Sequence, residues 1–279
     1  MSATSMANDS PTKPGGSAKP APRSGWKSSH LLLWQVGVGL SLLLLWELTS
    51  GRLYDVFWIS RPSLVLKYLA KYWADGLLMK DLTVTFKNAI IGYVLGSVFG
   101  VLFGFLLASA KRVADVLNPY IIATYGIPRI ALAPLMVVWF GIGDQSKIFL
   151  AAMMAFMLTF FNTYTGVRSV EPPLLNVARV MGASRWQLVY KVILPAASPW
   201  IIAGLQVSFP NALVSAVVGE FIAASAGLGF RLNYNGNTFN TAGTMAGVLL
   251  LMVIVLMLNH LLERAEAYLL RWRPKDQRR

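Results

Sequence analysis

Cysteine is absent from the 279 residues, and histidine occurs only at His30 and His260. The absence of cysteine excludes disulfide bonds, thiolate metal sites and a cysteine nucleophile. Two isolated histidines with no cysteine also argue against a metal centre built on imidazole ligands. We therefore expect no metal site in this chain.

Charged residues are scarce as well. They make up 13% of the sequence, against 56% apolar residues and a mean hydropathy of +0.55. This balance is too apolar for an ordinary soluble domain and indicates a chain that folds largely in lipid. The net charge of +13 does not indicate nucleic-acid binding, because the basic residues lie in tails and short loops rather than along one soluble face. We expect a multi-pass membrane protein without a nucleic-acid partner.

Motifs that would indicate chemistry in this chain are also missing. No G-x4-G-K-[ST] phosphate loop occurs, and the glycines near residues 141–147 have the wrong spacing for one. There is no G-x-S-x-G elbow and no H-E-x-x-H pair of the kind an intramembrane hydrolase would use. We expect no catalytic residues and no cofactor bound by this chain.

Apolar runs define the organisation of the chain. Residues 1–29 are rich in Pro, Ser, Gly, Ala and Lys, so we predict a disordered basic tail in the cytoplasm, followed by a membrane domain at 30–279. The first apolar run is too long for a signal peptide and lacks a small-x-small cleavage pattern, which favours an uncleaved helix. Runs long enough to cross about 30 Å of hydrocarbon lie at 31–49, 84–110, 119–140, 148–167, 200–223 and 242–262. The prediction is an all-α integral membrane protein with about six transmembrane helices.

Basic residues are distributed unequally between the two sides that these spans define. With the N-terminus inside, sixteen Lys and Arg fall on the cytoplasmic side and seven on the other, which favours cytoplasmic N- and C-termini. Five of the seven lie in segment 51–82. There Leu66, Leu69 and Trp73 recur at helical spacing with Lys67 and Lys71 displaced from them, so we expect an amphipathic helix at the membrane interface.

Small residues recur at intervals of four in two of the spans. Those in the second are Gly92, Gly96, Gly100 and Gly104, and those in the fifth are Gly204, Ser208, Ala212 and Ala216. A spacing of four puts each set on one helix face, where another backbone can approach closely. We interpret both faces as helix-packing surfaces rather than as ligand contacts.

The longest polar stretch between spans covers residues 168–197. Pro172 and Pro173 suit the start of a short helix, and Gly182 and Ala183 suit a turn after it. We expect a second helix after the turn, ended by Pro195. A helical hairpin of this kind in the cytoplasm is a docking element.

This hairpin resembles the EAA loop of binding-protein-dependent transport permeases, whose pattern is E-A-A-x3-G-x9-I-x-L-P. Gly182 and Leu194-Pro195 stand at the family's spacing, Asn176 and Val177 replace the first Glu and Ala, and Val192 replaces the Ile. The stretches APLMVVWFGIG at 133–143 and GEFI through GLGF at 219–230 resemble the nitrate, taurine and alkanesulfonate branch of the same family. Together the matches run from roughly Pro62 to Pro274, nearly the whole chain beyond the tail and the first span.

The resemblance implies a type I permease of an ABC importer in the bacterial inner membrane. It implies that the loop is a coupling helix seated in a cleft of an ATPase, with contacts from Asn176, Val177, Ala178, Gly182, Ala183, Leu194 and Pro195. The implied partners are two ATPase subunits that bind ATP and Mg, a second permease copy forming a homodimer, an extracytoplasmic substrate-binding protein, and membrane lipid. The chain itself would be a non-catalytic subunit that moves a small solute by alternating access.

Charges at membrane depth are costly, so an ionisable residue that lies there is a candidate for a functional role. Two such residues within the spans are candidates for the substrate path. Arg129 follows Pro128 in the third span, and Glu220 lies near the end of the fifth. Arg129 has two structural alternatives, which are to snorkel to the interface or to pair with a carbonyl freed by the proline. The alternative for Glu220 is to order the following loop through backbone donors.

The branch that this chain resembles, together with a lone cation at mid-span, leads us to expect a small anion as solute: a sulfonate, a nitrate-like ion or an organic carboxylate. Two other functions remain open at this point. A membrane-embedded enzyme would need catalytic side chains clustered at one depth. A secondary transporter would show inverted repeats and several intramembrane charges. Neither alternative accounts for the hairpin at 168–197.

Overall fold

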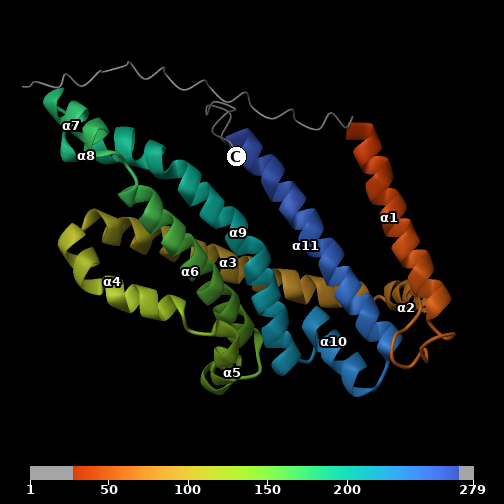
Figure 1. Ribbon diagram of the computed structural model, residues 1–279. Coiled ribbons are helices and arrows are strands. Elements are labelled where there is room, and N and C mark those ends of the chain that lie inside the picture. The colour runs from red at the N-terminus through yellow and green to blue at the C-terminus, as the bar shows by residue number, and fades with distance from the viewer. Residues whose placement is uncertain (1–27, 270–279) are drawn as a thin grey trace, which may run out of the picture. The chain divides into compact units, whose positions relative to one another are not determined.

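The computed structural model describes residues 28–269, and in this part the chain forms helices and no named β-strand (Figure 1). Residues 1–27 and 270–279 lie outside the described residues, so the predicted tail is not tested. In chain order the elements are α1 (Ser28–Thr49), α2 (Pro62–Ala74), α3 (Leu77–Ser109), α4 (Lys111–Tyr125), the 3₁₀ helix η1 (Arg129–Leu132), α5 (Ala133–Phe140), α6 (Asp144–Arg168), α7 (Pro172–Val180), α8 (Arg185–Leu188), the π-helical turn η2 (Val189–Ile193), α9 (Leu194–Ile222), α10 (Leu228–Asn237) and α11 (Thr241–Leu269).

The chain divides into two compact units, one ending at Trp46 and one beginning at Glu47. The described part of the first unit belongs to α1, whose side chains from Leu33 to Leu45 are mostly apolar and are exposed, for example at Leu42 and Leu44. A helix that is apolar on all sides suits contact with lipid. The second unit contains all the other helices.

Helices α3, α6 and α9 form the centre of the second unit. Gly92, Gly96, Gly100 and Gly104 all lie on the face of α3 that meets α6. A Cβ added at Gly100 or Gly104 would lie 2.8 or 2.7 Å from a backbone carbonyl oxygen of α6, and one at Gly96 would collide with the Ala152 carbonyl oxygen. The two backbones therefore approach so closely that only glycine fits between them.

The second small-residue face lies on α9 and packs in the same way. Gly204, Ser208, Ala212 and Ala216 are all buried. A Cβ at Gly204 would meet Asn162 of α6 at 2.7 Å, and Thr159 of α6 donates a hydrogen bond to the Ser208 hydroxyl. The spacing of four thus marks where α6 and α9 touch.

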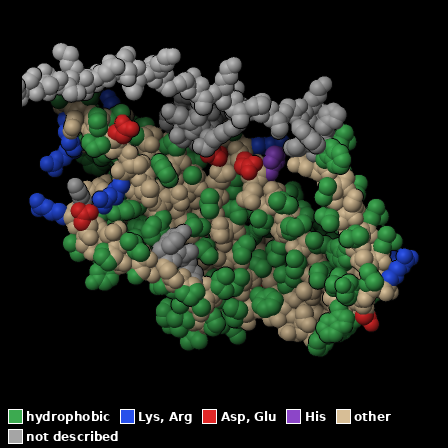
Figure 2. Space-filling model, in the orientation of Figure 1, with side chains coloured by type: hydrophobic (Ala, Val, Ile, Leu, Met, Phe, Trp, Pro, Cys, Tyr) green, Lys and Arg blue, Asp and Glu red, His purple; other side chains and the backbone are tan. Residues whose placement is uncertain are grey.

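Four helical segments among the described residues are long and apolar enough to cross a membrane: Leu77–Ser109, Asp144–Arg168, Arg185–Ile222 and Thr241–Tyr268. They match the second, fourth, fifth and sixth predicted spans to within one residue at the end of the second and fifth, and each helix begins before its predicted apolar run. Figure 2 shows hydrophobic side chains over the middle of these helices, while most visible Lys and Arg gather near α7, α8 and the start of α4.

The span predicted over 119–140 is not one continuous helix, and the backbone breaks beside the proline that was expected to free a carbonyl. The chain here forms α4, leaves the helix at Gly126, and continues as the short elements η1 and α5. Pro128 explains the break, because proline lacks an N–H and disfavours helical backbone at the preceding residue, Ile127. Hydropathy averaged over this stretch conceals the interruption.

The amphipathic helix expected within 51–82 is present as α2. Its buried side chains are Val65 and Tyr72, whereas Leu66 and Trp73 are exposed. Tyr72 and the half-buried Tyr68 contact a cluster that includes Leu78 of α3 and Leu228 of α10. The stripe that packs on the protein is thus Val65 and Tyr72, while Leu66 and Trp73, from the stripe predicted to meet the membrane interface, are exposed in the chain.

Candidate functional site

The segment 168–197 forms a hairpin of two short helices at one end of α9 (Figure 1). Helix α7 ends at Val180, and Gly182 then adopts φ +81°, a left-handed conformation that glycine accepts without strain. Helix α8 begins with a capping box, in which the Ser184 hydroxyl accepts the Gln187 N–H and the Gln187 side chain accepts the Ser184 N–H. The predicted turn at Gly182 and Ala183 is therefore present.

The second helix of the hairpin does not end at Pro195, contrary to the prediction. Helix α8 passes through η2 into α9 without a break, and Pro195 lies in the first turn of α9. The N–H of Leu194 donates to the Val189 carbonyl five residues back. This wider π-helical turn makes room for the proline ring, which would otherwise clash with the preceding turn of the helix.

The hairpin carries apolar side chains that no part of the described residues 28–269 covers. Val180, Met181 and Trp186 are 88%, 82% and 83% exposed, and no residue of α7 or α8 is buried. Arg179, Arg185 and Lys191 lie among them. Of the predicted coupling residues, Asn176, Val177 and Ala178 lie in α7, Gly182 and Ala183 in the turn, and Leu194 and Pro195 at the start of α9. Large apolar side chains that are exposed, with basic residues among them, are typical of a protein interaction surface.

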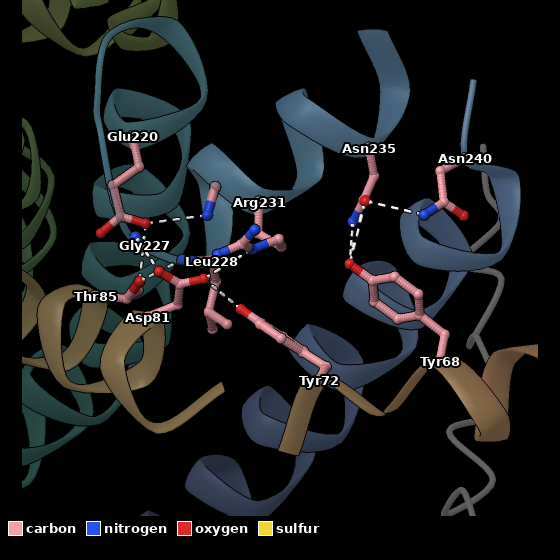
Figure 3. A network of polar contacts seen from close by, with 11 residues as sticks. Tyr68, Tyr72, Asp81, Thr85, Glu220, Gly227, Leu228, Arg231, Asn235 and Asn240 are labelled. Carbon is pink, nitrogen blue, oxygen red and sulfur yellow. Dashed lines mark hydrogen bonds and ion pairs between the residues drawn. The ribbon is translucent and has the colours of Figure 1, made fainter. Parts of the chain in front are cut away.

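At the opposite end of α9, Glu220 belongs to a buried polar network that holds the N-terminus of α10 (Figure 3). Glu220 Oε2 accepts the Gly229 N–H at 3.0 Å and the Thr85 hydroxyl at 2.8 Å. The Thr85 oxygen in turn accepts the Leu228 N–H at 2.9 Å. The first turn of a helix has N–H groups without intrahelical acceptors, and here residues of α3 and α9 supply them.

Asp81 of α3 supplies the remaining acceptors at this helix end (Figure 3). Its Oδ1 accepts the Gly227 N–H at 2.9 Å, and its Oδ2 accepts the Arg231 Nε–H at 3.0 Å and the Tyr72 hydroxyl at 2.5 Å. Burial, followed by the hydrogen bond to Asp81, raises the pKa of Tyr72. Partial burial opposes the charge on Arg231, but Asp81 outweighs it and holds the pKa of that guanidinium above its ordinary value.

Glycine is required where Glu220 meets this loop. Gly227 has φ +113°, and a Cβ there would collide with the Glu220 carboxyl group. A Cβ at Gly229 would collide with the Val217 carbonyl oxygen. The GLGF sequence thus follows from the close approach of this loop to α9. The geometry of Glu220 is that of a residue that orders the following loop, and a part in the substrate path stays a prediction.

A second polar cluster fixes the other end of α10 (Figure 3). Asn235 is buried, exchanges hydrogen bonds with the Tyr68 hydroxyl at 2.9 and 3.1 Å, and accepts one from Asn240 at 3.3 Å. A Cβ at Gly243 would lie 2.6 Å from the Asn235 side chain. Both ends of α10 are therefore tied to neighbouring helices by side chains.

Sequence reasoning missed the residues of α3 and α6 that carry much of this polarity. Asp81, Thr85 and Asn88 are buried and lie on one face of α3, at the spacing i, i+4, i+7 that continues to Gly92. Lys147, assigned to a loop from the sequence, is buried in the first turn of α6 and donates to the carbonyls of Ile142 and Gly143. The helical spacing of polar residues leading into the glycine face was a signal for the first three.

Arg129 begins η1, directly after Pro128, whose backbone is extended. Its side chain lies outside the described part of the structure, so its role in the substrate path stays a prediction. The neighbouring Ile130, together with Met153 of α6 and Ser215 of α9, lines a small void, so the backbone of this segment lies next to the central helices. Arg129 and Glu220 belong to different elements, η1 and α9.

The chain matches a known family of membrane proteins. Residues 92–273 match the model of the binding-protein-dependent transport system inner membrane component. The chain belongs to this family. The permease is 33% identical over 242 residues to the riboflavin transport system permease protein RibX of Chloroflexus aurantiacus, covering 87% of this chain and 86% of the relative. It is 29% identical to the taurine transport system permease protein TauC of Escherichia coli, covering 90% and 94%.

The fold of the permease is also found among solved structures. The chain resembles one in an inward-facing structure of the MetNI methionine ABC transporter, with a TM-score of 0.62, 20% identity, and coverage of 70% of this chain and 97% of that one. The permease is thus an importer-type ABC transporter permease with several membrane-spanning helices. Among the described residues, no three His, Asp or Glu side chains come together as metal ligands.

Proposed function

We propose that this chain is the transmembrane subunit of an ATP-driven importer, and that its α7–α8 hairpin docks on a separate ATPase. Two copies of the permease would pair, meet two ATPase subunits that bind ATP and Mg, and receive solute from an extracytoplasmic binding protein. Alternating access would follow ATP binding and hydrolysis in the partner. A symmetric pair is natural where one kind of permease meets two identical ATPases.

The observation that carries this proposal is the exposed hairpin at the end of a continuous helix. Because η2 joins α8 directly to α9, the segment Arg185–Ile222 is one helical rod of 38 residues, about 57 Å long. A push on Trp186 at one end is transmitted along α9 towards Glu220 and α10. Rigid-body motion of an ATPase would thereby reach the far side of the membrane.

The proposed topology places the hairpin and both termini in the cytoplasm of a bacterial inner membrane. In this proposal the four long apolar segments cross the membrane, α1 crosses it as a fifth, and the broken segment α4–η1–α5 crosses it as a sixth. Arg168, Arg179, Arg185 and Lys191 would then lie on the cytoplasmic side, in accord with the positive-inside rule. Helix α10 would lie at the outer surface.

For the solute we propose a small anion, such as a sulfonate, with Arg129 assisting its passage. The likeness to TauC, a taurine permease by its name, supports a sulfonate. The greater identity to RibX, named for riboflavin, shows that relatives of this chain serve different solutes. A cation beside a proline break would attract an anion where the effective dielectric is low.

Docking is tested by replacing one exposed tryptophan at each end of the molecule. Trp186→Glu in the hairpin should lower the amount of ATPase that copurifies with the permease about thirtyfold, the effect of about 2 kcal/mol expected for a buried aromatic anchor. Trp58→Glu is the matched control, because Trp58 is 73% exposed but lies outside the hairpin. Equal recovery of ATPase with both variants would contradict the docking assignment.

A further inference from the structure

A groove between α9 and α11 carries polar side chains that the proposed function does not use. It is lined by Gln206, Pro210 and Asn211 of α9, by Asn259 of α11, and by valines of both helices. The three amide side chains come from helices that are long and apolar enough to span the membrane. Asn211 and Asn259 are both exposed in the single chain.

Asn211 lies deep within its apolar span. It is 11 residues from the end of α9 at Ile222, about 17 Å along the helix axis. Asn259 lies nearer the polar end of α11, three residues before the end of the apolar run at 262. At the depth of Asn211 an amide facing hydrocarbon would lose its hydrogen bonds at a cost of several kcal/mol. Another protein surface or a water-filled space must therefore cover this part of the groove.

The backbone adds a further polar group at the same place. Pro210 has no N–H, so the carbonyl of Gln206 lacks its usual donor four residues ahead. Asn211 donates one N–H to the Val207 carbonyl at 2.8 Å, which fixes the side chain on the groove wall. Its Oδ1 has no partner among the described residues.

The chemistry of the groove suits a small polar solute. Carboxamides both donate and accept hydrogen bonds, so they can solvate oxyanions and hydroxyl groups alike. The lining contains no Lys, Arg, Asp or Glu, so no ion pair would hold the solute in place. A path must bind a solute well enough to admit it and weakly enough to release it.

We infer that the groove of Gln206, Asn211 and Asn259 is a wall of the solute path, and that it takes a small polar solute rich in oxygen acceptors through neutral hydrogen bonds. This inference rests on the proposed function and deepens it, because it assigns the path to residues other than Arg129 and Glu220. The two amides of Asn211 and Asn259 would contact solute from two different helices.

Cysteine labelling tests this assignment directly, since the chain has no native cysteine. Asn211→Cys, Asn259→Cys and, as a further site, Gln206→Cys are introduced singly and the assembled complex is treated with a charged, membrane-impermeant methanethiosulfonate. Val253→Cys is the matched control, because Val253 is exposed on α11 but is rotated about 200° from Val255 on the groove wall. We expect the groove cysteines to react at least tenfold faster than the control. Adding Mg²⁺ and a non-hydrolysable ATP analogue should change their rates at least threefold.

Three results would overturn the assignment. Groove cysteines that react as slowly as the Val253 variant would show a surface sealed by lipid or protein. A disulfide formed between two copies at position 211 would make the groove a permease–permease contact. Fast labelling at a rate that does not change when the ATP analogue is added would indicate a static, water-filled crevice. If the unmodified complex shows ATP-driven uptake in any of these cases, only the groove assignment fails, whereas absence of such uptake refutes the proposed function itself.

Discussion

Variants of Glu220 distinguish a structural role for this residue from a role in solute movement. Its Oε2 accepts hydrogen bonds from Thr85 and from the Gly229 N–H in a site where Glu220 is 1% exposed. Glu220→Ala leaves these two buried donors without an acceptor, at a cost of about 1–3 kcal/mol for each. We expect the free energy of unfolding to fall by about 2–6 kcal/mol, a large share of the roughly 5–15 kcal/mol that stabilises a typical protein.

Glu220→Gln should be much milder. The amide oxygen can accept both hydrogen bonds, and the new NH₂ group takes the place of Oε1, which has no partner among the described residues. Two charge-assisted hydrogen bonds become neutral ones of roughly half the strength, so we expect a loss of about 1–2 kcal/mol. Glu263→Ala, which removes an exposed carboxylate at the other end of the membrane domain, should change stability little.

Thermal unfolding in detergent and hydrogen exchange of the amides at 227–229 measure these effects. The account predicts early unfolding and rapid exchange at these amides for Glu220→Ala, with values close to those of the unmodified chain for Glu220→Gln and Glu263→Ala. A Glu220→Ala variant with normal stability and normal exchange, but without solute uptake, would refute the reasoning and place Glu220 on the substrate path.

Three further variants probe other parts of the structure. Gly96→Ala puts a Cβ against the backbone of α6 and should lower the free energy of unfolding by about 1–3 kcal/mol. Gly37→Ala is the control and should leave stability unchanged, because a Cβ at Gly37 has no described atom within 4 Å. Equal unfolding temperatures for the two variants would contradict the close packing of α3 on α6. Gly182→Asp should uncouple ATP hydrolysis from uptake more than Gly182→Asn, because a Cβ at this position meets none of the described residues within 4 Å and the two side chains differ mainly in charge. Identical coupling in the two variants would disprove a docked turn. Arg129→Gln should slow uptake of an anion such as taurine while binding-protein-stimulated hydrolysis persists; an unchanged rate would remove Arg129 from the path.

The long apolar helices and their packing faces were accessible from the sequence because each depends on local pattern. Hydropathy found the segments that became α3, α6, α9 and α11, and the spacing of small residues located the contacts among the first three. The turn at Gly182 was also predictable, since a glycine between two amphipathic stretches needs no distant partner. The residues that mark the family are local motifs of the same kind.

Features that depend on distant partners were not predictable. Asp81 and Gly227 are 146 residues apart, and nothing in one sequence pairs a carboxylate of α3 with the first turn of α10. The length of the second hairpin helix was misjudged because Pro195 normally signals a helix end, whereas η2 absorbs it by widening one turn. In the third span Pro128 signalled a break, but apolar composition on both sides of it did not show that α4, η1 and α5 follow as separate elements.

The central claim is that an ATPase drives solute movement through this permease. Uptake of taurine into proteoliposomes that contain the permease with a partner ATPase and a binding protein measures this directly. Riboflavin, for which RibX is named, is the second solute assayed. The account predicts uptake of one of them only when ATP, Mg²⁺ and the binding protein are all present, and its loss with Gly182→Asp. Uptake that runs on an ion gradient without ATP would contradict it.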